Sequence, residues 1–230
     1  MTPEGFAQEY GIKNAFIVSY GGNIQPPYNE LAKRFTGLRE VKWSVLGDAS
    51  SPLPEHELGN TLAVCDASES APNISGGVVD DFFSPKRIER FTPGVLRKMK
   101  QTLHEKGLDF WCVLYRHELN VIKNYLDCFD GITFWIWKCE EIAALDDILE
   151  ELFHTAEGKP IMLGVYLWDY GTGKSMDTAL FTKQIEHYFE LLKQRQIEGV
   201  IFCSNTIGDA DLETNRILRK MIQEHGDTQI

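Results

Sequence analysis

The chain has 230 residues, of which 43% are hydrophobic and 25% are charged, and its formal net charge is −11 at pH 7. This is ordinary globular composition, and the length is sufficient for a full hydrophobic core. The negative charge argues against nucleic acid or an anionic membrane as the main partner, whereas neutral small molecules such as sugars are compatible with it. No apolar run approaches the roughly 20 residues that span a bilayer, and no signal-peptide pattern begins the chain. We therefore expect a soluble protein, either cytoplasmic or secreted with its leader removed.

Five cysteines are spread along the chain, and none forms a C-x-x-C pair: Cys65, Cys112, Cys128, Cys139 and Cys203. Most lie in apolar segments, where cysteine behaves as a small hydrophobic residue. An odd number of cysteines in a chain of this size argues against a disulfide framework and against a cysteine zinc site. Only His117 among the histidines follows a predicted strand, so we expect no metal site, and we predict no cofactor.

The first half of the chain is predicted to alternate between helices and strands. In chain order we expect a helix at 2–12, a strand at 15–20, a helix at 28–35, a strand at 41–46, a helix at 55–70 and a strand at 74–79. Gly11 is expected to end the first helix. Val78 and Val79 run directly into Asp80 and Asp81, and a charge at the end of a buried strand is costly unless it has a partner or a function.

The second half continues the same alternation. Thr92-Pro93 is expected to start a helix that Gly107 ends. A strand at 109–115, a helix at 121–129, a strand at 132–137, a helix at 145–156, a strand at 160–168, a helix at 177–196, a strand at 200–203 and a helix at 211–224 follow.

Seven strand-then-helix units predict an α/β fold with a parallel sheet and helical crossovers. The candidates are a closed (β/α) TIM-like barrel and an open doubly wound sheet. We favour the barrel, as a single domain over residues 1–230, because no unit reads as an edge strand and no break in composition divides the chain. Barrels of this kind usually have eight strands. Either a strand near 61–65 is hidden, or the first strand precedes this chain.

Polar and aromatic residues follow the predicted strands, and in both candidate folds functional sites gather at the carboxyl ends of strands. The strand ends are Ser19-Tyr20, Asp48, Asp80-Asp81, Arg116-His117-Glu118, Lys138-Cys139-Glu140-Glu141, Trp168-Asp169-Tyr170 and Ser204-Asn205. Carboxylates among tryptophans and tyrosines suit carbohydrate chemistry. Glycoside cleavage needs one carboxyl group to protonate the leaving oxygen and a second to attack or to activate water.

We predict Asp81 as one catalytic carboxylate, with Asp80 orienting it or Arg116. Adjacent strand residues point to opposite faces, so only one of the two aspartates can face the barrel axis. Glu118 is the candidate general acid, because packing against Trp137 would favour its protonated form. Asp169 is the alternative second carboxylate. Each acid also has a structural interpretation: the aspartates as a cap or as partners of Arg87, and Glu118 and Asp169 as helix-start residues.

The remaining candidate site residues are substrate contacts. Tyr20, Tyr166, Trp137 and Trp168 are expected to stack on sugar rings. Arg116, His117, Lys138, Glu140 and Asn205 are expected to supply polar contacts at the same strand ends. Trp135 is predicted to be core packing.

Gly171-Thr172-Gly173-Lys174-Ser175 follows a predicted strand and imitates a phosphate-binding loop. The full pattern, G-x-x-x-x-G-K-[ST], requires glycine at position 168, where this chain has Trp168. In a phosphate-binding fold, Val78-Val79-Asp80 could be the acidic strand that binds the metal ion. A nucleotide-binding hydrolase that uses Gly173-Lys174-Ser175 is therefore the third functional candidate. A polar turn beside the site is the preferred interpretation of this segment.

Three segments resemble the (β/α)-barrel glycoside hydrolases, in particular uncharacterised glycosidase-like barrel proteins: residues 75–83 (SGGVVDDFF), 129–132 (FDGI) and 164–171 (GVYLWDYG). Chitinase-like enzymes have S-x-G-G on one strand and D-G-x-D-x-D-x-E on the next. Here Thr133, Trp135 and Trp137 replace the later acids of the second motif, so chitinase catalysis does not carry over. The resemblance implies a carbohydrate-active barrel.

We therefore expect a glycoside hydrolase that acts on a small carbohydrate or an oligosaccharide. The alternative is a non-catalytic carbohydrate-binding or accessory barrel. A pair of carboxyl groups facing each other across a cleft at roughly 5 to 10 Å would favour hydrolysis. Aromatic residues around a single carboxylate would favour binding.

Overall fold

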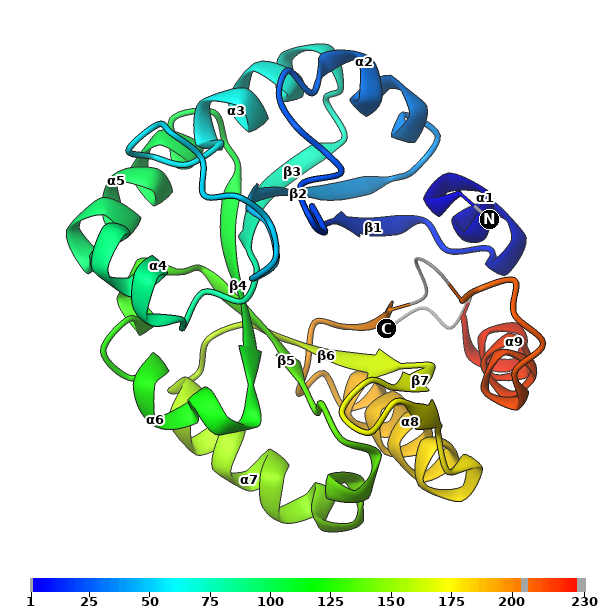
Figure 1. The fold of residues 1–230 in the computed structure, drawn as a ribbon. Coiled ribbons are helices and arrows are strands. Elements are labelled where there is room, and N and C mark those ends of the chain that lie inside the picture. The colour runs from blue at the N-terminus through cyan, green and yellow to red at the C-terminus, as the bar shows by residue number, and fades with distance from the viewer. Residues whose placement is uncertain (1, 204–206, 227–230) are drawn as a thin grey trace. The chain divides into compact units, whose positions relative to one another are not determined.

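A computed structural model of the chain describes residues 2–203 and 207–226 (Figure 1). Seven parallel strands form one sheet in the order β1-β2-β3-β4-β5-β6-β9, which is the order of the chain. A doubly wound sheet would reverse its strand order at a switch point, and this order contains no reversal. The strands alternate with helices, so the prediction of a TIM-barrel-like α/β fold is confirmed.

The strands of the main sheet are β1 (Asn14–Ile17), β2 (Glu40–Leu46), β3 (Ile74–Val79), β4 (Asp109–Tyr115), β5 (Gly131–Trp135), β6 (Ile161–Tyr166) and β9 (Gly199–Cys203). A separate antiparallel hairpin contains β7 (Trp168–Asp169) and β8 (Lys174–Ser175). The helices are α1 (Pro3–Tyr10), α2 (Asn29–Ala32), α3 (Thr61–Ser70), α4 (Pro85–Arg90), α5 (Pro93–His104), α6 (Leu119–Ile122), α7 (Leu145–Ala156), α8 (Thr178–Lys193) and α9 (Glu213–His225).

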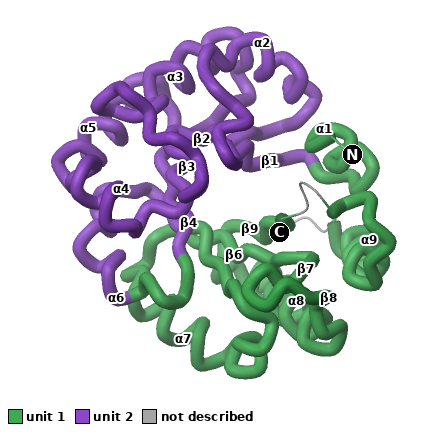
Figure 2. Tube along the Cα trace, in the orientation of Figure 1, with its two compact units in different colours: residues 1–12, 115–119, 133–230 green, residues 13–114, 120–132 purple. Residues whose placement is uncertain are grey.

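The chain divides into two compact units (Figure 2). Unit 1 comprises residues 1–12, 115–119 and 133–230, and unit 2 comprises residues 13–114 and 120–132. The single-domain organisation stays a prediction.

In unit 2, the two faces of the sheet differ. A Cβ on Gly77 would lie 2.9 Å from Leu103 of α5, so this face meets the helices. On the opposite face, the buried Lys42 ammonium lies 2.8 and 2.9 Å from the two carboxylate oxygens of Asp109 and 2.9 Å from Glu40. Residues therefore alternate between a helix-covered face and a face with a charged cluster.

Two strand glycines accommodate tryptophan rings from the preceding strand. In unit 2, a Cβ on Gly131 would lie 2.5 to 2.7 Å from ring atoms of Trp111. In unit 1, a Cβ on Gly164 would lie 2.1 to 2.4 Å from ring atoms of Trp135. No larger residue fits at either position without moving the indole. Trp135 is 8% exposed, which confirms its prediction as core packing.

In unit 1, the first and last helices contact each other. The Arg219 guanidinium of α9 lies 4.2 Å from the ring centroid of Tyr10 in α1 and pairs with Glu9. The Tyr10 hydroxyl donates to the carbonyl of Gly208 at 3.2 Å. Helix α1 therefore holds both α9 and the loop that leads into it.

Two predicted helices are wrong in extent. The helix expected at 55–70 begins only at Thr61, because Gly59 has a left-handed φ of +57° that interrupts helical geometry. The region 61–65 is therefore helical, and no strand is hidden there. The helix expected at 121–129 is only α6 between short 3-10 turns, and Tyr125 has non-helical angles (φ −128°, ψ −2°).

The strands expected at 15–20, 132–137 and 160–168 end earlier than predicted, at Ile17, Trp135 and Tyr166. Helix α4 and the β7–β8 hairpin were not predicted. All five cysteines have free thiols. None of the helices in the described ranges has the length and apolar character needed to cross a membrane.

Candidate functional site

In unit 2, Asp80 follows β3 and continues its alternation with Gly76 and Val78. Its backbone N–H donates to the carbonyl of Leu46 at 3.1 Å, so the ladder with β2 extends to this residue. A Cβ on Gly76 would meet Asp109, which places Gly76, Val78 and therefore Asp80 on the face opposite the helices. The residue keeps part of its surface exposed. Burial of its carboxyl group, with the nearby negative charge of Asp81, raises the pKa of Asp80 to about 7.

Asp81 has a left-handed backbone with φ of +43°, an unusual conformation for a residue other than glycine. Its carboxylate accepts a hydrogen bond from the backbone N–H of Ala49 at 2.9 Å. Its own N–H donates to the Asp80 carboxylate at 2.9 Å. Asp81 therefore leaves strand geometry and links the loop after β3 to the loop after β2.

Arg87 of α4 holds the ends of β2 and β3 together. Its guanidinium donates to the carbonyls of Gly47 at 2.6 Å and Asp80 at 2.7 Å, and to the carbonyl of Asp48. The side chain is 3% exposed, and burial lowers the pKa of Arg87, while the negative charges of Asp81, Asp80 and Asp48 act in the opposite direction. The buried guanidinium of Arg87 therefore interacts electrostatically with the carboxylates of Asp81, Asp80 and Asp48.

Asp48 organises the neighbouring loops. Its carboxylate accepts hydrogen bonds from the Ser51 hydroxyl at 2.6 Å, from the Ser50 hydroxyl, and from the Gly21 N–H at 2.9 Å. Burial raises the pKa of the Asp48 carboxyl, but these hydrogen bonds outweigh burial and hold the pKa below its usual value. Asp48 is therefore an ionised neighbour of Asp80. Tyr20, next to Gly21, is 63% exposed.

In unit 1, four aromatic side chains gather at the ends of β4, β5 and β6. We call Tyr115, Trp137, Tyr166 and Tyr170 the aromatic platform. The Trp137 ring lies nearly perpendicular to Tyr115 and Tyr166, with centroids 6.0 and 5.7 Å apart, and stacks on Tyr170 at 5.9 Å and 26°. The hydroxyl of Tyr166 donates to that of Tyr115 at 3.4 Å. Despite these neighbours, Trp137 remains 42% exposed.

The polar residues after β4 lie beside this platform. The buried Glu118 carboxylate accepts a hydrogen bond from the Tyr115 N–H at 2.9 Å, which caps the 3-10 turn at 116–118. His117 stacks on Tyr115 at 5.9 Å, and its Nε2 lies 3.8 Å from Glu118. Arg116 pairs with Glu141 at 3.4 Å. The capping interpretation of Glu118 therefore has direct support.

Asp169 is 5% exposed and its carboxylate is engaged inside the β7–β8 hairpin. It accepts hydrogen bonds from the N–H of Thr172 at 3.1 Å and from its hydroxyl at 2.6 Å. Lys174 and Ser175 form β8, and α8 begins only at Thr178 with Asp177 as its N-cap. In a phosphate-binding loop the Lys-Ser pair starts the helix, so this arrangement lends no support to nucleotide binding.

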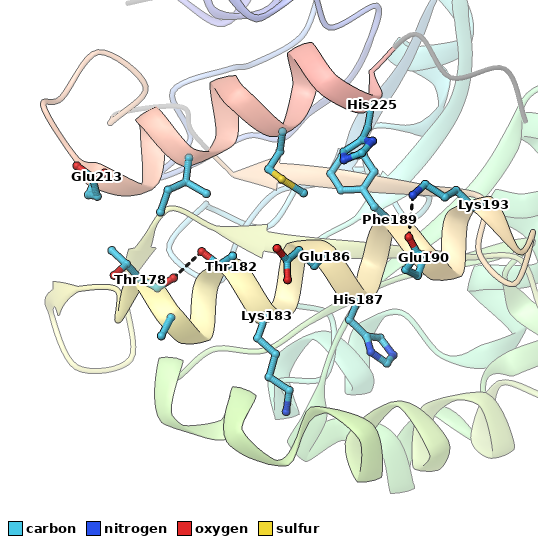
Figure 3. A pocket seen from close by; sticks show the side chains of 13 residues that line it. Thr178, Thr182, Lys183, Glu186, His187, Phe189, Glu190, Lys193, Glu213 and His225 are labelled. Atoms are coloured by element: carbon cyan, nitrogen blue, oxygen red, sulfur yellow. Dashed lines mark hydrogen bonds and ion pairs between the residues drawn. The ribbon is translucent and has the colours of Figure 1, made fainter.

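A cavity of about 930 Å³ lies on the helical side of unit 1, between α8 and α9 (Figure 3). Its lining consists of helix residues such as Lys183, His187, Glu190 and Met221, and includes none of the predicted strand-end residues. Sites in barrels form at the carboxyl ends of strands. We therefore place the candidate site at the strand ends and not in this cavity.

The structure brings together some of the predicted residues. Trp137 and Tyr166 meet in the aromatic platform, and Asp80 adjoins Asp81. Trp168, Lys138 and Glu140 belong to the same strand-end segments, and Asn205 lies outside the described residues. Sequence analysis assigned no site role to four residues: Asp48 and Arg87 in unit 2, where Arg87 was considered only as a structural partner of the aspartates, and Tyr115 and Tyr170 in unit 1. Asp48 and Tyr170 were noted only as strand-end residues.

Within the described residues, no group of three or more acids, histidines or cysteines is arranged to hold a metal ion.

No protein-family model matches the chain, and no curated protein matches it. Several solved structures, in contrast, match the fold of the chain. The glycoside hydrolase domain of PgaB (BpsB) from Bordetella bronchiseptica has a TM-score of 0.57 and 10% identity, covering 95% of this chain and 91% of that one. The spore cortex-lytic enzyme SleL of Bacillus megaterium QM B1551 has a TM-score of 0.60 and 12% identity, covering 96% and 70%.

A chitinase from Chromobacterium violaceum ATCC 12472 matches at a TM-score of 0.57 and 12% identity, covering 98% of this chain and 95% of the chitinase. Identities this low establish the fold and leave the chemistry to the site residues. The expected resemblance is confirmed at that level. The chain has the (β/α)-barrel fold that these solved structures share.

Proposed function

We propose that the protein is a carbohydrate-active barrel and, more specifically, a glycoside hydrolase whose catalytic carboxylates include Asp80 and Asp81. The Asp80–Asp81 pair at the end of β3 carries this proposal. A proton donor must hold its proton near neutral pH, and the raised pKa of Asp80, about 7, meets that requirement. The fold shared with PgaB, SleL and the chitinase is consistent with this class of enzyme.

The roles within the pair follow from the environment of each carboxyl group. Asp80 shares the face opposite the helices and loses solvation, so we assign it the proton donor. Asp81 accepts a hydrogen bond from Ala49 and is the candidate for the second carboxylate. Glu118 and Asp169 remain candidates for that second role. Their carboxylates already accept local hydrogen bonds, which would have to be exchanged for substrate contacts.

The aromatic platform would bind the substrate. Flat aromatic faces suit the apolar face of a pyranose ring, and an exposed indole with three aromatic neighbours offers such a surface. Arg116, His117, Lys138 and Glu140 follow the same strands and are candidates for contacts with hydroxyl groups, whereas Tyr20 and Trp168 remain candidates for stacking on sugar rings. The proposed partner is a carbohydrate, and the net charge of −11 argues against nucleic acid or an anionic membrane as the main partner.

A non-catalytic sugar-binding barrel is the second candidate. The local hydrogen bonds of Glu118 and Asp169 favour it, because they leave the platform with aromatic rings and few free carboxylates. Both candidates predict that the protein binds a sugar, but only the glycoside hydrolase predicts that it cleaves one.

The test is a screen of the parent protein and the double variant Asp80→Asn/Asp81→Asn against aryl glycosides and polysaccharides. The proposal predicts hydrolysis by the parent and a loss of at least about a hundredfold in the double variant, with sugar binding retained. Asp66→Asn is the matched control, because Asp66 is an exposed aspartate of α3. Binding without turnover by the parent would favour the accessory barrel, and equal turnover in the double variant would move the catalytic site elsewhere.

A further inference from the structure

The β7–β8 hairpin is docked on the end of β5 through its turn. The N–H of Gly171 donates to the carbonyl of Trp137 at 3.2 Å, and a Cβ on Gly171 would lie 2.9 Å from that oxygen and 2.5 Å from Lys138 Cγ. Only glycine allows this approach. The hairpin therefore contacts Trp137, the exposed residue of the aromatic platform, at the backbone as well as through a side chain.

The same turn positions a ring on Trp137. Tyr170 is the first residue after β7, and its ring stacks on Trp137 at 5.9 Å and 26° while meeting Tyr166 at 5.2 Å and 68°. Tyr170 keeps part of its surface exposed. The pair thus presents two nearly parallel rings, one of them 42% exposed, beside the ends of β5 and β6.

Asp169 determines the shape of this turn. Its carboxylate accepts two hydrogen bonds from Thr172, and its carbonyl accepts one from the N–H of Gly173 at 2.8 Å. Gly173 has a left-handed φ of +68°, as a tight turn requires. At its other end the hairpin is held by Thr214 of α9, whose hydroxyl donates to the Leu167 carbonyl at 2.8 Å. Because its carboxylate is bonded to Thr172, Asp169 influences the site by fixing the conformation of the turn.

We propose that Tyr170 is a specificity-determining residue that forms one wall of the sugar platform with Trp137, and that Asp169 is a positioning residue that holds Tyr170 there by closing the β7–β8 turn. This inference rests on the proposed carbohydrate-active function. It assigns Tyr170 a direct contact with the sugar ring, and its positioning role for Asp169 would replace the alternative role of that residue as second catalytic carboxylate, leaving Glu118 as the alternative to Asp81.

The experiment compares Tyr170→Ala, Tyr170→Phe, Asp169→Ala and Thr172→Val with the parent protein. Near-UV circular dichroism reports the stacked Trp137–Tyr170 pair, and far-UV circular dichroism reports folding. Calorimetric titrations with chitohexaose, cellohexaose and para-nitrophenyl β-glucuronide report sugar binding. Thr182→Val is the matched control for Thr172→Val, because the exposed Thr182 hydroxyl donates only within α8, to the carbonyl of Thr178.

We expect Tyr170→Ala and Asp169→Ala to change the near-UV spectrum in the same way, with the far-UV spectrum unchanged. Both should weaken binding of the sugar that the parent prefers by about tenfold, the effect of one aromatic contact. Tyr170→Phe keeps the ring and should bind within about twofold of the parent. Thr172→Val should show part of the Asp169→Ala effect, and it replaces that variant if Asp169→Ala does not fold.

A parent-like near-UV spectrum in both Asp169→Ala and Thr172→Val would overturn the positioning role. If Tyr170→Ala kept the affinity and the sugar preference of the parent, the assignment of Tyr170 as a wall of the sugar platform would be overturned. If the parent binds none of the three probes, the proposed function fails and the sugar contact of Tyr170 fails with it. The spectra of the Asp169 and Thr172 variants would still decide the positioning role, so the two failures are distinguishable.

Discussion

Asp80 combines burial of its carboxyl group with the negative charges of Asp81 and Asp48, and all three disfavour its ionisation. The buried Arg87 opposes them without forming a direct pair, because its guanidinium is taken up by the carbonyls of Gly47, Asp48 and Asp80. The balance leaves a carboxyl group whose pKa is about 7 next to one that is fixed by Ala49. The raised pKa would let Asp80 hold a proton near neutral pH, as the proposed role requires.

This balance predicts how stability depends on pH. A carboxyl group whose pKa is raised on folding stabilises the folded state most below its unfolded pKa of about 4, and that contribution is lost as the pH rises through about 7. Asp80→Asn removes the titration, so the variant should gain stability relative to the parent at about pH 8 and gain less at about pH 5. Urea unfolding at the two pH values measures this. An equal change at both would contradict the raised pKa.

Arg87 should be the most sensitive residue of this group. Arg87→Met leaves three buried carbonyls without a donor and removes the cation among three carboxylates, so we expect a loss of about 2–4 kcal/mol in the free energy of unfolding. It should also raise the pKa of Asp80 further, because the positive charge of Arg87 lowers it. Chemical denaturation measures the loss, with the exposed Arg34→Met as control. Equal stability of the two variants would show that Arg87 does not hold β2 and β3.

At the scale of elements, each of Gly131 and Gly164 faces a tryptophan of the preceding strand. Gly164→Ala would place a Cβ 2.1 to 2.4 Å from the Trp135 ring, and we expect a loss of about 1–3 kcal/mol from this overpacking. Gly37→Ala is the control, because nothing lies within 4 Å of its added Cβ, and it should change stability by less than about 0.5 kcal/mol. Thermal unfolding of both variants, compared at one pH, tests the contact. If Gly164→Ala were as stable as the parent, the close contact between Gly164 and the Trp135 ring would be excluded.

Elements with their own start or stop residues were predictable from the sequence. Helix α5 begins at Pro93 as expected, α1 ends with Gly11 in a left-handed conformation, and the apolar pattern at 145–156 matches α7. The β7–β8 hairpin was missed because its strands are two residues long, too short for a period-two pattern. Tyr170 was therefore seen only as a strand-end residue, since its contact with Trp137 depends on how the hairpin docks.

For the whole molecule, strict alternation of strands and helices was sufficient to predict the fold. It also predicted that Asp80, Asp81, Trp137 and Tyr166 would lie at strand ends. The alternation of side chains predicted that only one of the two aspartates can face the barrel axis, but it did not determine which one, and the left-handed backbone of Asp81 departs from strand geometry. The orientation of Asp80 depends on the register of β3, where a Cβ on Gly76 would meet Asp109. The pKa of Asp80 is raised first by burial and then by Asp81, with a smaller contribution from Asp48, and both the burial and the approach of Asp48, which is distant in sequence, arise only in the folded unit.

The most direct test of the account is the dependence of kcat/KM on pH for the parent and for Asp80→Asn, on a glycoside that the parent cleaves. If Asp80 is the proton donor, kcat/KM of the parent falls as the pH rises through about 7, because the group loses its proton. Asp80→Asn should then be slower by about a hundredfold or more at about pH 6 and should lack this fall. A variant with the rate and pH profile of the parent would contradict the assignment of Asp80.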